Sequence, residues 1–425
     1  MLTGKLRLYY LYLRYYLTQP PKDLWERFRA WLHRKTWRAT ANPKNVVLLG
    51  GSFAGFELSR QLVHRLPSGH RVIMIERNSH FNYTFNFPRY SVLQGHEHKA
   101  FLPYTGITDS APKGIWQHVR GEITDVDSDC VTLTNGQIVP YSYLVVATGA
   151  TQTPPAKLLA SDRKLACEEL QVFQESIKLS QRIAVVGAGA VGVEIACDIK
   201  YFYPQKQVTL VHSRSAILQR FGPKLQAHAL AEVKKLGIEV ILNERPKTIP
   251  CADELMDRKG RGQSLSFSDG GIVNYDLVIP CTGQSPNSGI LSSLAPEAIS
   301  ASTGRLLVHP TLQLSSKEHS SRIFAVGDVA ETPGPKMARA ALTQVHVVVA
   351  NLMSLIRGQK PVQEYEPNHE IEGSLHLTLG VENWATWFHP KGGDEVLITG
   401  TNGKPDLYIE GAWKYWGARI EEAGV

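Results

Sequence analysis

Two glycine-rich turns, each directly after an apolar run, carry residues suited to binding an anion. In the second turn, Gly187, Gly189 and Gly192 follow the apolar run 183–186 and precede a helical pattern. In such a turn the first glycine permits a tight bend, the second lets the backbone approach a pyrophosphate, and the third lets helix and strand pack closely. The helix N-terminus then favours the phosphate charge. This G-x-G-x-x-G pattern predicts a dinucleotide-binding turn.

The first turn lies in NVVLLGGSFAGFE and departs from that pattern. Its key positions are Gly50, Gly51, Ser52 and Gly55, so that serine replaces the central glycine. The serine side chain is small enough to leave room for a phosphate. A second apolar run ends at Glu76, 26 residues after Gly50, and Arg77 follows it. An acid at this position accepts hydrogen bonds from ribose hydroxyls, so the sequence predicts a second nucleotide site here.

The strand that follows the second turn ends differently. Residues 208–211 run into His212, Ser213 and Arg214, with no carboxylate at the strand end. An acid there holds the 2′-hydroxyl of NADH, whereas an arginine accommodates the 2′-phosphate of NADPH. Both nucleotides therefore stay open as the ligand of the second site.

Further polar segments follow strands and are expected at the same sheet edges, because open α/β sheets bind ligands at the carboxyl ends of their strands. These segments are Thr148-Gly149, Gly283 and Gly327-Asp328. Asp328 can reach a polyol hydroxyl from the end of its strand. The patterns also predict a helix over 336–355, single strands over 119–125 and 406–410, and an antiparallel excursion over 240–276.

Composition describes an ordinary globular protein of two or three domains, with 425 residues, 43% apolar and 20% charged. Residues 1–44 hold ten Lys or Arg and two acids, and the remaining chain is close to neutral. A near-neutral body disfavours nucleic-acid binding, which needs a broad basic face. The five cysteines are scattered without a C-x-x-C pair. This spacing argues against a metal site, a disulfide framework and a redox-active dithiol.

The basic N-terminal segment predicts short amphipathic helices. In residues 23–38, one face carries Leu24, Phe28, Trp31 and Leu32, and basic residues lie mostly on the other. A basic helix with Trp, Phe and Leu on one face suits an anionic membrane surface. The same features also suit a mitochondrial transit segment, or a helix that packs on its own protein. The segment 2–17 is too short to cross a bilayer.

Several stretches together resemble the two-dinucleotide-binding flavoprotein oxidoreductases, and among them the fungal-type apoptosis-inducing factor homologues of the ferroptosis-suppressor kind. The resemblance covers residues 45–425 and rests on these runs: NVVLLGGSFAGFE, YLVVATGAT, IAVVGAGAVGVEIACDIKYFYPQKQVTLVHS, DLVIPCTGQSPNS, IFAVGDVAETPGPKMARAALTQVHVVVANL and AWKYW. The two longest runs are the most specific. His80-Phe81 and 85–89 resemble the loop that lines the flavin, where aromatic rings either stack on a ligand or pack in the core.

The resemblance implies an α/β fold with two Rossmann-like (βαβ) dinucleotide-binding domains of the glutathione-reductase type, a small C-terminal α+β region and an N-terminal helical extension. The implied boundaries are a basic extension over 1–44, an FAD-binding domain over 45–150 and 283–360, an NAD(P)H-binding domain over 151–282 and a C-terminal region over 361–425.

The implied cofactors are FAD in the first site and NADH or NADPH in the second. FAD is expected on Gly50, Gly51, Ser52, Gly55, Glu76, Arg77, Thr148, Gly149, Gly327 and Asp328. NAD(P)H is expected on Gly187, Gly189, Gly192, Glu194, His212, Ser213, Arg214 and Gly283. Lys336, at the start of the last long helix, is the candidate for tuning the flavin through its positive charge. No metal is expected.

The expected activity is hydride transfer from NAD(P)H to FAD, followed by electron transfer to a quinone-type acceptor. A small metabolite or a partner protein as the acceptor is the first alternative, and a signalling or nucleic-acid-binding role like that of apoptosis-inducing factors is the second. The expected location is intracellular, either membrane-associated or mitochondrial. The sequence leaves the oligomeric state open.

Overall fold

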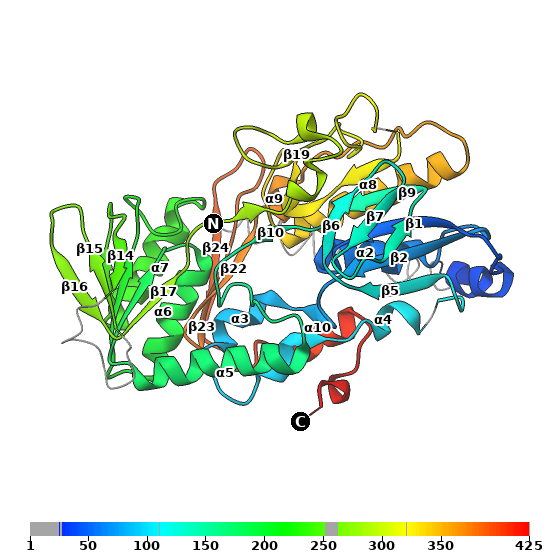
Figure 1. Ribbon diagram of the computed structural model, residues 1–425. Helices are drawn as coiled ribbons and strands as arrows, with labels where there is room; N and C mark the ends of the chain where they lie inside the picture. Colours follow the sequence, from blue (N-terminus) through cyan, green and yellow to red (C-terminus); the bar gives the residue numbers. More distant parts are fainter. Residues whose placement is uncertain (1–24, 26–27, 110, 251–261, 320, 425) are drawn as a thin grey trace.

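A five-stranded parallel sheet forms the centre of the first lobe in the computed structural model, which describes residues 25, 28–109, 111–250, 262–319 and 321–424. The strand order is β20-β9-β1-β2-β5 (Figure 1). The strands are β1 (Lys44–Leu49), β2 (His70–Glu76), β5 (Trp116–Arg120), β9 (Tyr143–Val146) and β20 (Ile323–Ala325). Each neighbouring pair is parallel, so the carboxyl ends of all five strands lie along one edge.

Both faces of this sheet are covered, which explains why β1 reads as the apolar run VVLL. Val46 and Leu48 face the helices α2 (Phe53–Leu62) and α8 (Ala338–Ile356) in one core cluster. Val47 and Leu49 face the antiparallel strands β6 (Ile123–Val126), β7 (Cys130–Leu133) and β8 (Ile138–Pro140) in another. Helix α8 is long and apolar enough to cross a membrane, but more than half of it is buried in this core.

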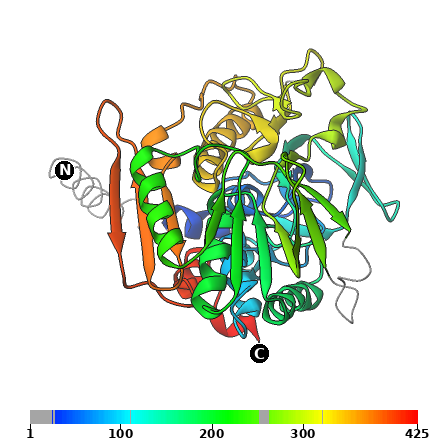
Figure 2. The same ribbon diagram turned by 90° about the vertical axis from the view of Figure 1, so that its left-hand side faces the viewer.

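A second parallel sheet forms the other lobe and is coloured in shades of green in Figure 2. Its strand order is β13-β12-β11-β17. Its strands are β11 (Arg182–Val186), β12 (Gln207–Val211), β13 (Glu239–Ile241) and β17 (Leu277–Pro280). Helices α6 (Ala190–Phe202) and α7 (Pro223–Lys235) share one core cluster with it. The antiparallel strands β14 (Lys247–Pro250), β15 (Gln263–Ser266) and β16 (Ile272–Tyr275) form a separate small sheet, and β15 and β16 pack against the second sheet. Helix α5 (Arg163–Leu179) leads into β11.

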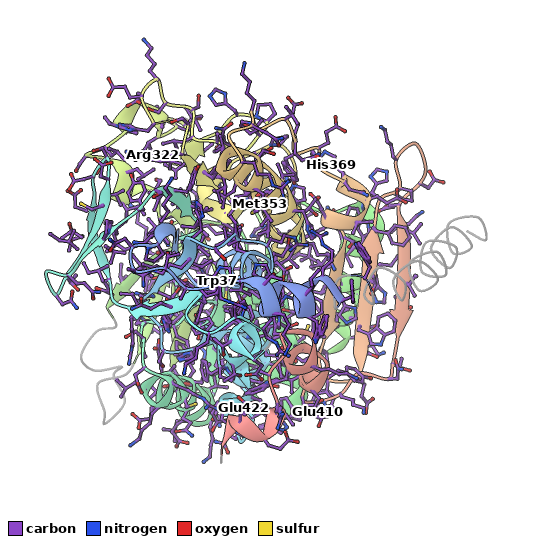
Figure 3. The ribbon with its side chains drawn as sticks, turned by 90° about the vertical axis from the view of Figure 1, so that its right-hand side faces the viewer. Trp37, Arg322, Met353, His369, Glu410 and Glu422 are labelled. Carbon is purple, nitrogen blue, oxygen red and sulfur yellow. The ribbon has the colours of Figure 1, made fainter. Side chains whose placement is uncertain are left out.

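The C-terminal segment contacts both lobes. The antiparallel sheet β22 (Leu375–Leu379), β23 (Asn383–Phe388) and β24 (Val396–Gly400) shares the core of α6 and α7. The chain then returns to the first lobe in α10 (Ile409–Tyr415). Trp413 and Trp416 are buried there in the same cluster as Trp37, which precedes β1 (Figure 3 labels Trp37).

Three expected elements differ from the structure. The strand predicted over 119–125 is two strands, β5 and β6, in different sheets, because the chain bends at Gly121, whose N–H donates to the Glu76 carbonyl. The strand predicted over 406–410 is instead a turn into α10, because Leu407 and Tyr408 both adopt left-handed backbone angles. The helix predicted from Lys336 begins at Ala338, after an extended N-cap residue. The helix predicted over 23–38 is seen over residues 28–36, and the segment 2–17 lies outside the described residues.

A buried ion pair joins the lobes to the C-terminal sheet. Arg89 in α3 (Phe87–Tyr90) places its Nε 2.7 Å from Oδ2 of Asp198 in α6, and both side chains are fully buried. A second guanidinium nitrogen, Nη2, donates to the Gly380 carbonyl at 2.8 Å, in the turn between β22 and β23. One side chain thus ties together three parts of the chain that are far apart in sequence.

We expect Arg89→Met to lower the free energy of unfolding by about 3–5 kcal/mol, because it leaves the buried Asp198 carboxylate unpaired. Urea unfolding followed by far-UV circular dichroism measures this loss. The matched control is Arg120→Met, which removes an exposed arginine 3.7 Å from Asp162 and should cost no more than about 1 kcal/mol. Equal losses in the two variants would contradict the assignment.

Candidate functional site

The first glycine turn brings β1, β9 and α2 into direct backbone contact. Gly50 has a φ of +102°, and a Cβ at this position would lie 2.5 Å from the Ala147 carbonyl oxygen. A Cβ on Gly55 would lie 1.8 Å from the carbonyl oxygen of Gly50. Only glycine fits either position, and the N-terminus of α2 is held against the end of β1. Ser52 is the N-cap residue, but its hydroxyl makes no capping hydrogen bond.

Glu76 is fixed beside this turn at the end of β2. Its Oε2 accepts the N–H of Gly51 at 2.6 Å, and its Oε1 accepts the N–H of Asn78 at 2.8 Å. The carboxylate is therefore held where the sequence predicts ribose hydroxyls. Arg77 points elsewhere: its exposed guanidinium lies 3.8 Å from the Glu122 carboxylate, so its contact with the nucleotide stays a prediction.

The second turn repeats this geometry in the second lobe. Gly187 has a φ of +115°, and a Cβ on it would lie 2.4 Å from the Cys281 carbonyl oxygen. A Cβ on Gly192 would lie 1.9 Å from the carbonyl oxygen of Gly187. Gly189, the N-cap of α6, has open space where its Cβ would be. Gly283, with a φ of +76°, follows β17 at the same edge.

Both turns fit a pyrophosphate. Neither α2 nor α6 has an acidic residue in its first turn, and neither N-cap side chain occupies the free N–H groups. No carboxylate from the first turn of either helix therefore competes with an anion for the positive end of its dipole. The open space at Gly189 is where a phosphate can approach the backbone.

The backbone register makes Glu76 and His212 equivalent residues. Each directly follows the strand residue whose carbonyl accepts the N–H of the first turn glycine, at 2.9 Å for Gly50 and 2.7 Å for Gly187. The equivalence appears only when the two lobes are aligned by these hydrogen bonds. Histidine thus occupies the place of the ribose-binding acid in the second site.

His212 also reproduces the turn contact of Glu76. Its Nδ1 accepts the N–H of Ala188, the second residue of the turn, at 3.2 Å. Burial, with a smaller contribution from Arg214, lowers the pKa of His212 and favours the neutral ring that this contact requires. Ser213 is half-buried and Arg214 is exposed at the same strand end. The second site therefore presents a neutral imidazole and a cation where the first presents a carboxylate.

Two residues that the sequence reasoning missed hold the remaining segments of the first site. Asn287 donates from Nδ2 to the Thr148 carbonyl at 2.9 Å and from its backbone N–H to the Gly149 carbonyl at 2.9 Å. Gln344 in α8 accepts the N–H of Gly327 at 2.8 Å. Asn287 lies in the run TGQSPNS. The sequence pattern of this run does not indicate that the Asn287 amide holds the segment Thr148-Gly149. Contacts of this kind are set by tertiary packing.

Asp328 and Lys336 lie close to this part of the site. Asp328 sits in the short helical turn η6 (Gly327–Val329) directly after β20 and is half-buried. Lys336 lies two residues before α8, so the prediction that it starts the helix is wrong. Its ammonium donates to the carbonyl and hydroxyl oxygens of Thr332 at 2.9 and 2.8 Å, and that hydroxyl accepts from Gln344 at 3.2 Å. Burial lowers the pKa of Lys336.

Glu194 of α6 contacts the C-terminal sheet. Its Oε1 accepts the backbone N–H of Thr378 at 3.2 Å and lies 3.3 Å from the Thr378 hydroxyl. Burial raises the pKa of this carboxyl to about 8. The structure places Glu194 against β22 of the C-terminal sheet, so its contact with the nucleotide stays a prediction.

The aromatic side chains of the loop after β2 differ in burial: some lie in the core and one lies at the surface. Phe81 and Phe87 are fully buried, whereas 54% of Phe85 is exposed. The Phe85 ring lies 5.0 Å from that of Phe53, next to the first turn, and 5.3 Å from that of Tyr83. One exposed ring, Phe85, therefore stands beside the first nucleotide turn, next to the half-buried rings of Phe53 and Tyr83.

The described residues contain no group of three His, Cys, Asp or Glu side chains that could hold a metal ion. Cys130, Cys167, Cys197 and Cys281 are free thiols.

Comparison with known proteins finds one matching family and several related proteins. Residues 44–345 match the pyridine nucleotide-disulphide oxidoreductase family. The chain is 32% identical to Fe-regulated protein 8 of Mycosarcoma maydis, covering 80% of this chain and 87% of that protein. It is 32% identical to human ferroptosis suppressor protein 1, covering 87% of this chain and 95% of that protein.

Among solved structures, the sulfide:quinone oxidoreductase of Aquifex aeolicus superposes with a TM-score of 0.68 at 16% identity, over 90% of this chain and 92% of that one. At this identity the likeness shows a shared α/β fold with Rossmann-like nucleotide-binding units, as the sequence predicted.

We expect His212→Glu to shift nucleotide preference toward NADH and away from NADPH by about tenfold or more, because a carboxylate accepts the 2′-hydroxyl and repels a 2′-phosphate. Kd values for the two nucleotides, measured by isothermal titration calorimetry, report the shift. The control is His212→Gln, whose amide oxygen can still accept the Ala188 N–H without adding charge. If both variants change the preference equally, the charge at this position is not what selects the nucleotide.

Proposed function

Because the chain belongs to the pyridine nucleotide-disulphide oxidoreductase family, we propose that it passes a hydride from NADH or NADPH to FAD and then electrons to a quinone-type acceptor. The chain is an FAD-dependent oxidoreductase that uses NAD(P)H. The observation that carries the proposal is the repetition of one backbone geometry, at Gly50–Gly55 and Gly187–Gly192, on the edges of two parallel sheets. One chain with two dinucleotide sites is suited to moving a hydride between them.

The residues of the first lobe position FAD by its sugar and phosphate groups. We assign Glu76 to the ribose hydroxyls, the N-terminus of α2 to the pyrophosphate and Asp328 to the ribitol chain. When bound, FAD supplies the ring that accepts the hydride. The ammonium of Lys336, fixed by Thr332 near Asp328, adds positive charge that would stabilise a reduced ring.

The residues of the second lobe orient the nicotinamide nucleotide. Gly189 and the N-terminus of α6 face its pyrophosphate, and His212, Ser213 and Arg214 face its adenosine ribose. We assign the first lobe to residues 45–150 and 283–360, the second to 151–282 and the C-terminal region to 361–425. The basic segment 1–44 precedes them.

A small group of aromatic rings, in which Phe85 is exposed and Phe53 and Tyr83 are half-buried, supports a flat acceptor. Phe85, Phe53 and Tyr83 lie within ring-contact distance of one another beside the first turn. Such rings stack on planar ligands. The Aquifex aeolicus neighbour is a sulfide:quinone oxidoreductase, which supports the same acceptor class. A small metabolite or a partner protein is the alternative acceptor.

A nucleic-acid-binding or signalling role has less support. Outside the basic segment 1–44, the chain is close to neutral, whereas binding to phosphate backbones needs a broad basic face.

Stopped-flow mixing tests the reaction in two stages. We expect NADH or NADPH to bleach the absorbance of the bound flavin, and a soluble ubiquinone analogue to restore it faster than oxygen does. If neither nucleotide bleaches the flavin, the hydride-transfer assignment fails. If the flavin is reduced but quinone restores it no faster than oxygen, only the acceptor assignment fails.

The helix over residues 28–36 supports a membrane surface as the place of action. About half of each side chain is exposed at Phe28, Trp31 and Leu32, and the ring of Phe28 lies 6.1 Å from that of Trp31. Its other side is attached to the protein, where His33 Nε2 lies 2.8 Å from the Leu66 carbonyl and Trp37 is buried.

Exposed basic side chains flank this aromatic face, among them Arg29, Arg34 and Lys35. Charge and apolar surface together match an anionic lipid surface. We propose that the enzyme acts at an intracellular membrane surface, which this helix contacts. The alternative is that the same segment directs import into mitochondria.

We expect the triple substitution of Phe28, Trp31 and Leu32 by serine to weaken binding to liposomes that contain anionic lipid at least about tenfold, since each buried apolar side chain contributes about 1.5–3 kcal/mol. Co-flotation of the full-length protein with the liposomes measures it. Leu159 and Leu165, exposed leucines elsewhere on the surface, are replaced by serine as the control. Undiminished binding of the triple variant would rule out this face as the membrane contact.

A further inference from the structure

The carboxyl group of Glu372 is buried beside α8 without a counter-charge. Glu372 ends the short helix α9 (His369–Glu372), whose first residue is labelled in Figure 3, and only 1% of it is exposed. Its Oε2 accepts the hydroxyl of Tyr365 at 2.6 Å, whereas no described residue hydrogen-bonds its Oε1. No lysine or arginine in the described ranges forms an ion pair with it. Because burying an unpaired carboxylate is costly, its position points to a role beyond packing.

The direction of the Tyr365 hydroxyl is set by this carboxylate. Tyr365 is buried, and an ionised carboxylate can only accept, so the single hydroxyl proton points to Glu372. Burial, and then the bond to Glu372, raise the pKa of Tyr365, which keeps the hydroxyl protonated. The Gln344 side chain acts on the same hydroxyl and lowers its pKa, as a donor does, because a donated N–H stabilises the phenolate. The oxygen of Tyr365 therefore accepts from the Gln344 amide.

The amide of Gln344 is fixed in one orientation by these contacts. Its Oε1 accepts the N–H of Gly327 at 2.8 Å, and its Nε2 donates to the hydroxyl of Thr332 at 3.2 Å. An amide nitrogen carries two N–H groups, so the second can serve Tyr365. The reversed amide would turn its NH2 group to the N–H of Gly327 and its oxygen to that of Tyr365, whose proton is held by Glu372. The buried carboxylate thus selects the orientation.

The other two partners of this amide belong to the first site. Gly327 begins the turn after β20 that carries Asp328. Thr332 holds the ammonium of Lys336 with its carbonyl and hydroxyl oxygens, at 2.9 and 2.8 Å. One amide therefore connects the buried carboxylate to the turn and to the ammonium.

We propose that Glu372, acting through Tyr365 and Gln344, positions this turn and this ammonium, and so strengthens the preference of the first site for reduced over oxidised flavin. These three are positioning residues that act through the turn and through Lys336. The proposal rests on the proposed function, because it requires FAD in the first site with Lys336 near its ring.

The midpoint potential of the bound flavin measures this preference without any turnover. Equilibration of the FAD-loaded, full-length protein with reference dyes gives the potential. We expect Tyr365→Phe, which breaks the connection, to reduce the preference for reduced flavin roughly tenfold, a fall of about 30 mV for a two-electron couple. In the Lys336→Met background the same substitution should change the potential much less, because the ammonium that it positions is absent.

Two further positions separate positioning from a general loosening of the core. Tyr141→Phe makes the same change at another buried tyrosine of the first lobe, whose hydroxyl donates to the Asp127 carbonyl at 2.7 Å, and should leave the potential unchanged. Glu372→Met should lower the potential as Tyr365→Phe does. Glu372→Gln keeps an acceptor oxygen for the hydroxyl and should retain most of the wild-type value.

An unchanged potential in Tyr365→Phe would overturn the proposal, and so would equal falls with and without Lys336, or an equal fall in Tyr141→Phe. If far-UV circular dichroism shows that Tyr365→Phe does not fold, Glu372→Met in the same two backgrounds decides in the same way. An unchanged potential in Lys336→Met would overturn the tuning role of Lys336 together with this proposal. Failure of the wild-type protein to bind FAD would instead overturn the proposed function.

Discussion

Backbone contact at the two glycine turns is the constraint on which the rest of the site depends. At Gly50 and Gly187 the chain passes so close to the neighbouring strand that only a hydrogen atom fits, and at Gly55 and Gly192 the helix packs directly on the turn. Because of this contact, the N-termini of α2 and α6 open onto the carboxyl edges of their sheets. Charge from the helix dipoles, Glu76 and Asp328 can act on a ligand only because these edges are held in place.

Buried polar contacts hold the two lobes and the C-terminal sheet in one arrangement. Arg89 pairs with Asp198 and also binds the turn that contains Gly380, and Glu194 meets Thr378 on the same side of α6. Burying these groups is expensive unless the partners are held in good geometry. In the proposed reaction the two nucleotides are held by different lobes, and hydride transfer between them would need such fixed geometry.

Local sequence patterns predicted the glycine turns, because the strand, the turn and the helix are adjacent in the chain. They could not show that His212 occupies the place of Glu76, since that requires the hydrogen-bond register of two separate sheets. Asn287 and Gln344 were missed for a related reason: their partners lie in other segments, and nothing in their neighbouring residues marks them. The 406–410 error arose from side-chain preference, which does not reveal the left-handed backbone of Leu407 and Tyr408.

The return of α10 to the first lobe has a consequence for the order of folding. Trp413 and Trp416 are buried in the same core as β1, and a Cβ on Gly106 would lie 1.9 Å from the Trp416 carbonyl oxygen. During synthesis the second lobe has its parallel sheet and helices once β17 is made, and strands β22 and β23 complete its core later. The first lobe, although it begins earlier in the chain, lacks part of its core until residue 416 is made. Part of its apolar core is therefore uncovered until the end of translation, and surface of this kind is where incomplete chains aggregate.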